Sequence, residues 1–487
     1  MRFSNLAFGL AFLALAACGG SPKAKSAGPV AARVSRADAR KAVAVTVYND
    51  GFGLVREVRD VELGTGRVSL EFRDVSSQIE PNTVHVKSVG EDGSKALSVL
   101  EQNYRYDLLS PEKLLSKYVG KSIKLYRYNK TTGKDEEIDA EVLSVNENQP
   151  VLKVGDQITY GFPARFAFPE VPKNLIADPS LVWLLDSERD RQTLEVTYLT
   201  QGFGWSADYV LTVGEETAGG MSKADLVGWV TLRNDTSTSF EDAQLKLVAG
   251  NVQRVLARGE GKVASATFAD DVAEKKQFTE ESFFEYHLYG LDRPTNLLSN
   301  EQKQVTLLEA HGVDVHRQLI FYGASYYFRG SYGQVVSNQK VGVFLEIKNE
   351  EKNHMGMPLP KGTVRVYKAD KSGSSQFIGE DAIDHTPRDE KLRIKMGESF
   401  DVVGDRKQTD FKSISTCVGE TAWEIALRNH KDVADEVLVN EPIEGDWQVL
   451  QSSLPYDKKD AHTFTFTAKI PARGETKITY RVRVRWC

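Results

Sequence analysis

The chain has few of the residues that build metal or redox centres. Among its 487 residues are 3 cysteines, 5 methionines and 8 histidines, which leaves little material for a large metal or redox cluster. An excess of positive charge is also lacking, because 62 Lys and Arg stand against 68 Asp and Glu, a formal net charge of −6. A general nucleic-acid binder needs a basic surface that displaces counterions from phosphates. We therefore expect no metal, no cofactor and no nucleic-acid partner.

Long apolar runs are also lacking beyond the N-terminus. None reaches the roughly 20 residues that a bilayer-spanning helix needs. The overall composition, with 41% hydrophobic and 27% charged residues, is that of a chain that folds. Its length suits about three domains on the usual prior.

The N-terminus carries a targeting pattern. A basic start is followed by an apolar stretch, Leu6–Ala17, of secretory rather than transmembrane length. The sequence around Cys18, Leu-Ala-Ala-Cys-Gly, resembles the lipobox of bacterial lipoproteins, in which the signal is cut before the cysteine and the cysteine is acylated. Two or three acyl chains would anchor the protein stably. We predict a lipoprotein signal peptide over residues 1–17, with a plain signal peptide as the alternative, and a lipidated Cys18 that begins a flexible tether over 18–42.

The residues after Cys18 bear on the destination. Gly19 and Gly20 follow it, and neither is Asp. By resemblance to the sorting rule of Gram-negative lipoproteins, this favours the outer membrane. We expect the protein in the cell envelope, lipid-anchored at the outer membrane and facing the periplasm, with surface display as the alternative.

The body of the chain alternates apolar and polar residues with a period of two. The clearest segments are Arg67–Phe72, Thr193–Tyr198, Thr463–Thr467 and Arg481–Trp486. This pattern is typical of a half-buried antiparallel strand. A helix could not place the apolar residues of such a pattern on one face and the polar residues on the other. Because turn signals fall between such runs, we predict an all-β chain of several immunoglobulin-like β-sandwiches with few helices.

Residues 101–180 have a different pattern, with a helix signal followed by short, closely spaced strands. Ser110 and Pro111 are typical of a helix N-terminus, and the helix is expected to end near Val119; a weaker helix candidate is Ala269–Lys276. Four or five short strands then follow within about 50 residues, which predicts an inserted small β-barrel of the SH3 or OB type, or a β-meander that caps the first sandwich. The expected domains are 43–100 (first part of a sandwich), 101–180 (inserted barrel with a short helix), and sandwiches over 181–310, 311–410 and 411–487.

One motif occurs four times. An alternating strand stops at Asn followed by a polar residue in Ala44–Asp50, Val230–Asp235, Leu345–Glu350 and Ala426–His430. Asn can end a strand cheaply because it tolerates the left-handed conformation and bonds its own backbone two residues on. The unequal spacing excludes a repeat of fixed period. It suits sandwich modules that share one corner, although chance similarity of strand ends gives the same pattern.

Several spaced motifs resemble a known family. Residues 197–209, TYLTQGFGWSADY, look like the hallmark of an uncharacterised bacterial family, whose domain of unknown function lies at the C-terminal end of mucoidy-inhibitor-A-like proteins. Residues 229–250, 357–367 and 480–486 are similar as well, so the resemblance covers most of 43–486. It implies a β-sandwich fold and an envelope setting, and it supplies no activity and no catalytic residues. The N-terminal coiled coil of some relatives is missing, and the 101–180 insertion takes its place.

No pattern of reactive residues points to catalysis. The sequence contains neither a nucleophile elbow nor a phosphate-binding glycine loop, and the five-residue spacing of His311 and His316 puts them on different faces of a strand. We therefore predict no catalytic residues. With Cys18 lipidated, Cys417 and Cys487 remain, and an even pair in an oxidising compartment predicts a disulfide; two free thiols are the alternative.

Two surface features could serve binding. The densest aromatic stretch is Ile320–Tyr332. Within it Tyr322, Tyr326, Tyr327 and Phe328 are the candidate platform for glycan rings or the edge for strand addition, with packing in the core as the alternative, because strands favour aromatics. A row of arginines at 481, 483 and 485 needs carboxylates on a neighbouring strand or open water, or else an acidic partner.

These observations favour binding over turnover. We predict a non-catalytic lipoprotein, held to the membrane by its lipid, that acts as a scaffold or interaction module in envelope assembly or integrity, with an envelope protein or glycan as partner. The alternative is an enzyme or enzyme accessory acting on envelope glycans, which a cleft with carboxyl groups about 5–10 Å apart would support. An exposed apolar patch or open strand edge would support the scaffold, and a surface adhesin is a third possibility.

Overall fold

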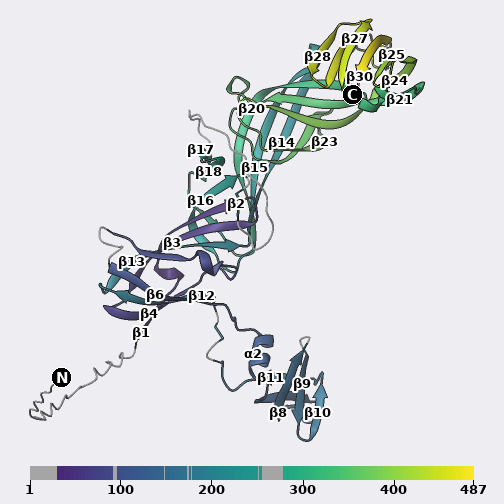
Figure 1. Ribbon diagram of the computed structural model, residues 1–487. Helices are drawn as coiled ribbons and strands as arrows, with labels where there is room; N and C mark the ends of the chain where they lie inside the picture. Colours follow the sequence, from purple (N-terminus) through teal and green to yellow (C-terminus); the bar gives the residue numbers. More distant parts are fainter. Residues whose placement is uncertain are drawn as a thin grey trace, which may run out of the picture.

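The computed structural model describes residues 30–90, 96–146, 149–172, 175–176, 178–250, 252–254 and 278–487. Cys18, the predicted signal peptide and the weak helix candidate at 269–276 lie outside these residues. Strands dominate the described part and form four sheets (Figure 1). The predicted all-β fold of several sandwiches with few helices is confirmed. Among the described residues, no helix has the length and apolarity to cross a membrane.

The first sandwich is built from residues on both sides of the inserted segment. Alternation places Leu70 and Tyr198 in its core, where both are fully buried. One layer has the strand order β1 (Ala31–Ser35), β4 (Gly66–Arg73), β12 (Ser180–Ser187), β6 (Leu97–Arg105). The facing sheet has the order β17 (Phe278–Phe283), β18 (Tyr286–Leu291), β16 (Phe240–Ala249), β2 (Arg40–Tyr48), β3 (Phe52–Glu62), β13 (Arg191–Gln201), β5 (His85–Ser88), and β19 (Thr295–Leu297) pairs with β16.

The largest sheet continues from this sandwich to the far end of the molecule. Its first strands share one hydrophobic core with the first sandwich, a cluster that extends from Val43 to Ile394. The order is β23 (Ser375–Ile383), β22 (Gly362–Ala369), β14 (Phe203–Glu216), β15 (Met221–Asn234), β20 (Glu301–Tyr322), β21 (Gln334–Lys348), β24 (Lys391–Ser413), β25 (Val418–Asn429), β30 (Glu475–Arg485), β27 (Asp446–Ser452). Off this path, β26 (Asp435–Pro442) pairs with β20 and β29 (Thr463–Ile470), and β28 (Tyr456–Asp460) pairs with β29.

Three strands of this sheet are long enough to serve two sandwiches. β20 has 22 residues, β21 has 15 and β24 has 23. Val315 and Ile394 belong to the core shared with the first sandwich, while Leu319 and Val402, further along the same strands, belong to a separate core. That second core defines the distal sandwich, which is closed by β25–β30. The expected domain borders after residues 310 and 410 fall inside β20 and β24, so the chain is not interrupted at either place.

The resemblance motifs meet in the middle of this sheet. β14 contains the end of the 197–209 motif and pairs in parallel with β22, which contains most of the 357–367 motif. Gly362 is needed at this contact, because a Cβ there would lie 2.2 Å from the carbonyl oxygen of Ala207. The hydroxyl of Tyr209 also donates a hydrogen bond to the carbonyl of Pro360 (2.8 Å). Both motifs therefore serve packing.

The inserted segment forms a five-stranded open sheet. As predicted, the helix α2 (Pro111–Lys117) begins after Ser110, whose hydroxyl accepts a hydrogen bond from the Lys113 N–H (3.2 Å). The expected small β-barrel is wrong, because the sheet is open and its two outer strands do not pair with each other in the described residues. Instead Tyr118, which follows the helix, packs against Phe168 at 5.1 Å between ring centroids. The strand order is β10 (Gln157–Tyr160), β9 (Gln149–Val154), β8 (Lys134–Asn146), β7 (Ser122–Asn129), β11 (Arg165–Ala167).

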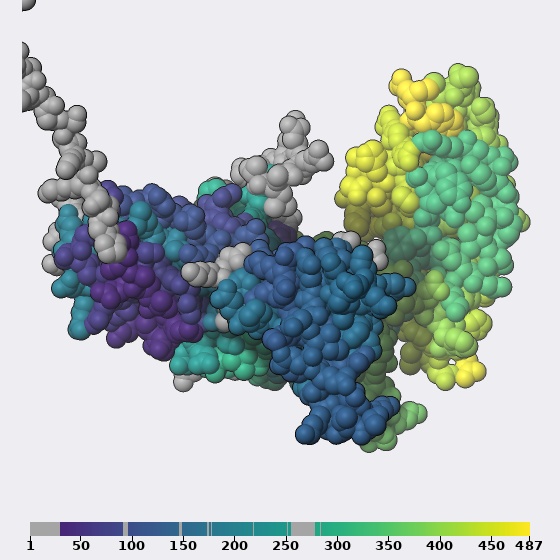
Figure 2. Space-filling view, turned by 90° about the horizontal axis from the view of Figure 1, so that it is seen from below, coloured from purple at the N-terminus to yellow at the C-terminus, as the bar shows by residue number. Residues whose placement is uncertain are grey.

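The sandwiches follow one another in an elongated molecule. Figure 1 shows the N-terminal side with β1 at one end and the sandwich of β25–β30 at the other. Figure 2, turned by 90°, shows the same order, with the inserted sheet in blue standing out in front of the other parts. β1 and the distal sandwich therefore lie far apart.

The repeated Asn motif forms a buried corner in three of its four copies. Asn234, Asn349 and Asn429 are 0–3% exposed. Each side-chain NH₂ donates to two backbone carbonyls, and each side-chain carbonyl accepts a backbone N–H. Asn49 differs, since its side chain accepts one long bond, from the Gly250 N–H (3.3 Å). The shared geometry supports a recurring corner over chance similarity.

Replacing one of these buried asparagines should destabilise the fold, although the side chain carries no charge. Asn349→Ala removes bonds to the carbonyls of Met357 (2.9 Å) and Pro387 (3.0 Å) and leaves the Gly356 N–H without its acceptor. Because buried groups left unpaired cost about 1–3 kcal/mol, we expect a loss of that size in the free energy of unfolding, measured with urea. Asn103→Ala on exposed β6 is the matched control and should change stability little; an equal loss in both variants would contradict the assignment.

Candidate functional site on the distal sandwich

The aromatic stretch 320–332 divides into an inner and an outer side. Tyr327 and Phe328 lie in the short helix Ser325–Arg329 and are 7% and 1% exposed. Tyr322, Tyr326 and Tyr332 are 40%, 54% and 43% exposed. Of the four candidates for a binding platform, Tyr327 and Phe328 pack in the core. Tyr322 and Tyr326 lie on the surface.

The inner residues close the end of the distal core. The ring centroids of Tyr327 and Phe328 lie 5.7 and 6.1 Å from that of Trp423 on β25. Phe328 also packs against Phe464 on β29, at 6.3 Å. The segment 323–333, here named the tyrosine loop, is thus held down by its own aromatic side chains.

One glutamine fixes the position of the tyrosine loop. Gln408, 6% exposed on β24, accepts the Tyr332 N–H (2.6 Å) with its side-chain carbonyl. Its NH₂ group donates to the carbonyl of Gly330 (2.8 Å) and to the hydroxyl of Thr421 (2.8 Å). At the start of the loop, the Gly323 N–H bonds the carbonyl of Asn440 (2.8 Å). These hydrogen bonds therefore tie the loop to β24 and β26, and its outer side is held in a fixed form.

The outer side combines rings with charge. The rings of Tyr326 and Tyr332 meet edge to face at 6.0 Å between centroids, and the Tyr332 hydroxyl donates to the Tyr326 carbonyl (3.0 Å). Glu444 accepts a bond from the Ser325 hydroxyl (2.9 Å) and pairs with Arg329. Exposed tyrosines beside an arginine have the composition of interaction hot spots. This tyrosine surface (Tyr326, Tyr332, Arg329 and Glu444) is the candidate functional site.

An ion pair lies buried beneath the loop. The side chains of Arg406 on β24 and Glu441 on β26 are both 0% exposed, and an Nη1–Oε1 distance of 2.6 Å joins them. The Tyr480 hydroxyl donates to the same carboxylate (3.1 Å). The guanidinium carbon lies 5.3 Å from the ring centroid of Tyr327. Burial raises the pKa of the Glu441 carboxyl above its usual value, against the opposing effect of Arg406.

The first sandwich contains a similar buried unit. Arg59 and Glu57, both 0% exposed on β3, are joined at 2.7 Å, and the Tyr198 hydroxyl donates to Glu57 (3.3 Å). The Arg59 guanidinium lies 3.6 Å from the Phe72 ring centroid. Sequence reasoning missed both units. The sequence of β3 did indicate one of them, because Glu57 and Arg59 stand between Val55 and Val61 among the residues that alternation places inside.

The two remaining cysteines meet at the surface of the distal sandwich. Cys417 and Cys487 form a disulfide with a Cα–Cα distance of 5.4 Å, across 70 residues of sequence. The Trp486 N–H also donates to the carbonyl of Cys417 (3.0 Å). The C-terminus is therefore fastened to the turn before β25.

Two arginines of the row on β30 pair with carboxylates on other strands of the sheet, and the third bonds the backbone. Arg481 bonds Asp410 (2.7 Å), and Arg483 bonds Glu420 (2.8 Å). Arg485 donates to the carbonyl of Cys487 (3.1 Å). The protein itself therefore supplies partners for these arginines, so the row does not require an acidic binding partner.

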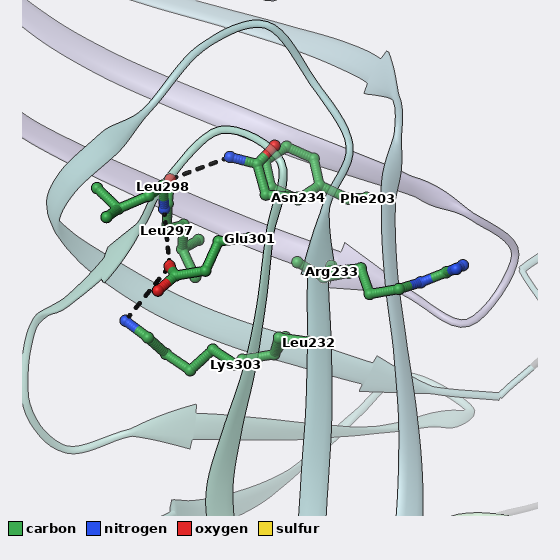
Figure 3. A pocket seen from close by; sticks show the side chains of 9 residues that line it. Phe203, Leu232, Arg233, Asn234, Leu297, Leu298, Glu301 and Lys303 are labelled. Carbon is green, nitrogen blue, oxygen red and sulfur yellow. Dashed lines mark hydrogen bonds and ion pairs between the residues drawn. The ribbon is translucent and has the colours of Figure 1, made fainter.

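Other candidates for chemistry do not converge. Within the described part of the chain, no group of three or more His, Cys, Asp or Glu side chains could hold a metal ion; His311 lies 3.3 Å from Asp225 alone. Figure 3 shows a hollow lined by Asn234 and Glu301. Its volume is about 10 Å³, which is enough for one water at most.

Comparison with known proteins adds no identification. A scan against protein-family models finds no match, and a search of curated proteins finds none either. The resemblance to the mucoidy-inhibitor-A-associated family therefore stays a prediction from the sequence motifs.

Proposed function

We propose that the protein is a non-catalytic lipoprotein of the cell envelope whose rigid body holds an interaction surface at a fixed distance from the first sandwich. In this proposal Cys18 carries the lipid at the outer membrane, facing the periplasm, and the tyrosine surface binds an envelope protein. The observation that carries it is the continuity of β20, β21 and β24, which belong to both cores of the molecule.

Continuous strands make a rigid connection. A flexible linker between sandwiches would let them reorient, as domains with small interfaces commonly do. Here bending would disrupt the pairing of β21 with β24, which runs from Gln334 to Lys348 with four register shifts. Such a body suits a scaffold, since it fixes where a partner is held.

The partner class follows from the surface. Exposed tyrosine rings supply large contact area at low conformational cost, and Arg329 and Glu444 supply charged hydrogen-bonding groups beside them. The loop is already tied down by Gln408, so little ordering is required on binding. An envelope protein with an apolar, hydrogen-bonding patch would fit this surface, and a glycan is the competing ligand.

Photocrosslinking from the tyrosine surface tests the proposal. With a photoreactive amino acid at Tyr326 in the lipidated full chain, we expect one envelope protein to be captured reproducibly in cells at near-equal stoichiometry. Tyr332→Ala should reduce this capture several-fold, because it removes the neighbouring ring of the hot spot. The control variant, Tyr456→Ala, removes a tyrosine that is 40% exposed on β28 and should leave capture unchanged.

A second arm of the same experiment addresses the anchor. Cys18→Ser should move the protein from the membrane fraction to the soluble periplasmic fraction and abolish capture of a membrane-bound partner. Glycan adducts in place of a protein, or capture that ignores Tyr332→Ala, would contradict the proposed partner. Membrane retention of Cys18→Ser would contradict the lipid anchor.

A further inference from the structure

The tip of one β-hairpin exposes an aromatic ring in an unfavourable backbone conformation. β17 and β18, the outermost strands of the 8-stranded sheet (Figure 1), are joined by the two-residue turn Phe284–Glu285. Phe284 has a φ of +57° and is 70% exposed. Turn positions with positive φ favour Gly, Asn and Asp, because a bulky side chain is costly there. The turn therefore gives up stability to present this ring.

The residue at this turn differs from those at comparable positions. Among the described residues, the other non-glycine positions with positive φ hold Asp, Asn, His or Arg, all of them polar. A single exposed apolar side chain needs no explanation. A phenylalanine that is both exposed and conformationally costly breaks two local rules at once, and such violations occur at functional sites. Phe284 is therefore the candidate binding residue of the hairpin.

The ring is supported before any partner binds. Its centroid lies 6.2 Å from that of Tyr286 on β18. Tyr286 is half-buried and packs on Gly250, where an added Cβ would lie 2.6 Å from the tyrosine ring. The Gly250 N–H donates to the side chain of Asn49, which follows β2 (3.3 Å). A protruding ring that is supported in this way loses little freedom on entering a pocket.

The surroundings of the ring are acidic. β17, β18 and the turn between them contain Glu280, Glu281 and Glu285 and neither lysine nor arginine. Glu280 bonds His287 (2.8 Å), and Lys246 on β16 lies 3.8 Å from Glu281, whose side chain is 60% exposed. The complementary surface is therefore apolar at its centre and basic at its rim. A membrane fits less well, because one ring inserts little apolar area and the glutamates repel anionic headgroups.

We propose that this hairpin is a second protein-binding site, at which the Phe284 ring enters an apolar pocket bordered by lysine or arginine on a partner protein. The ring supplies the central anchor, and the glutamates contact the basic rim. The hairpin belongs to the first sandwich, whereas the tyrosine surface lies on the distal sandwich (Figure 1). The site goes beyond the proposed scaffold role, because two surfaces on one body bridge two partners.

Photocrosslinking with peptide mapping tests the hairpin. A photoreactive amino acid replaces Ser282, an exposed residue of β17 next to the turn, in the lipidated full chain in cells. We expect one protein to be captured, with the adduct on a peptide that combines apolar residues with Lys or Arg. An adduct to lipid, an adduct peptide without basic residues, or no protein adduct would overturn the proposal.

Variants separate the ring and the charge from general effects. Phe284→Asn suits the turn, so it should reduce capture at least tenfold without lowering the thermal unfolding temperature, and Glu281→Lys should reduce capture several-fold. The matched control is Phe400→Asn, since Phe400 is an 86% exposed phenylalanine on β24, in the other large sheet. This control should leave capture unchanged. Capture that persists in Phe284→Asn would show that the ring is not the anchor.

A variant of the tyrosine surface keeps the two proposals apart. Tyr332→Ala should leave capture from Ser282 intact, because the hairpin binds its own partner. Loss of that capture in Tyr332→Ala would mean that both surfaces hold one partner, and would contradict a second site. Failure of the hairpin leaves capture from Tyr326 unaffected, so failure here and failure of the proposed scaffold are distinguishable.

Discussion

Replacing Glu441 by glutamine should cost the distal sandwich about 3–5 kcal/mol in free energy of unfolding, the usual cost of removing one partner of a buried ion pair. The substitution keeps the shape of the side chain but leaves the charge of Arg406 unpaired at 0% exposure. The Nε and Nη2 atoms of Arg406 already have no hydrogen-bond partner among the described residues. The cost therefore falls on a guanidinium whose charge the neutral amide of glutamine does not balance.

A double variant separates the missing partner from lost packing. Arg406→Met with Glu441→Leu replaces both charges by apolar groups of similar size. Because burial raises the pKa of Glu441 despite the adjacent guanidinium, the pair itself carries a large desolvation cost. We expect the double variant to be far closer to the unmodified protein than Glu441→Gln is.

Urea unfolding followed by the fluorescence of Trp423 and its neighbours provides the measurement. Equal losses in the single and double variants would mean that the packing of these side chains, and not their charge, stabilises the core. Glu436→Gln, on the exposed side of the same strand, should lie within about 0.5 kcal/mol of the unmodified protein.

Removing the disulfide should have the second largest effect. Cys417→Ser with Cys487→Ser opens a loop of 70 residues, for which the chain-entropy model gives about 4 kcal/mol. The substitution also frees the C-terminal end of β30. There the Trp486 ring packs so closely on Gly419 that a Cβ on residue 419 would lie 2.7 Å from it. The distal sandwich should therefore unfold at a lower temperature in the double serine variant.

Calorimetry with and without a reductant checks this expectation. The reductant should lower the unfolding temperature of the unmodified protein to that of the double serine variant and leave the variant unchanged. A reductant effect of equal size in the variant would mean that the stabilisation does not come from this bridge.

The fold class was readable from the sequence because alternation survives in most strands. Arg67–Phe72 and Thr463–Thr467 alternate so regularly that they predict β4 and β29 directly. The Asn corner was readable for a related reason: a side chain that bonds its own neighbouring backbone leaves a local signal. Both features depend on residues close together in sequence.

Features that depend on distant partners were not readable. The parallel pairing of β14 with β22 joins Ala207 to Gly362, and no local pattern encodes that choice. The expected border after residue 410 falls inside β24, which continues to Ser413, and no local pattern marks a strand that two sandwiches share. Buried Arg406 was missed because a charged residue in a strand is ordinarily assigned to the solvent face.

The tyrosine surface was half readable. Composition singled out the stretch around Tyr326, but a strand pattern could not show that it leaves β20 and turns into a short helix. That turn sends Tyr327 and Phe328 inward and Tyr326 outward. Gln408, which fixes the loop, lies 76 residues from its partner Tyr332 and had no signal of its own.

The rigid connection between the two cores is the central claim, and an electron-spin distance measurement tests it most directly. Nitroxides attached through a ketone-bearing amino acid at Gln302, near the start of β20, and at Lys459 on the distal sandwich leave the native disulfide intact. About 20 residues of β20, at ~3.3 Å each, separate Gln302 from the tyrosine loop. We predict a single distance distribution as narrow as that of a reference pair within the distal sandwich, Lys412 and Lys459. A broad or two-peaked distribution for Gln302 and Lys459 would show that the sandwiches reorient, and would contradict the scaffold.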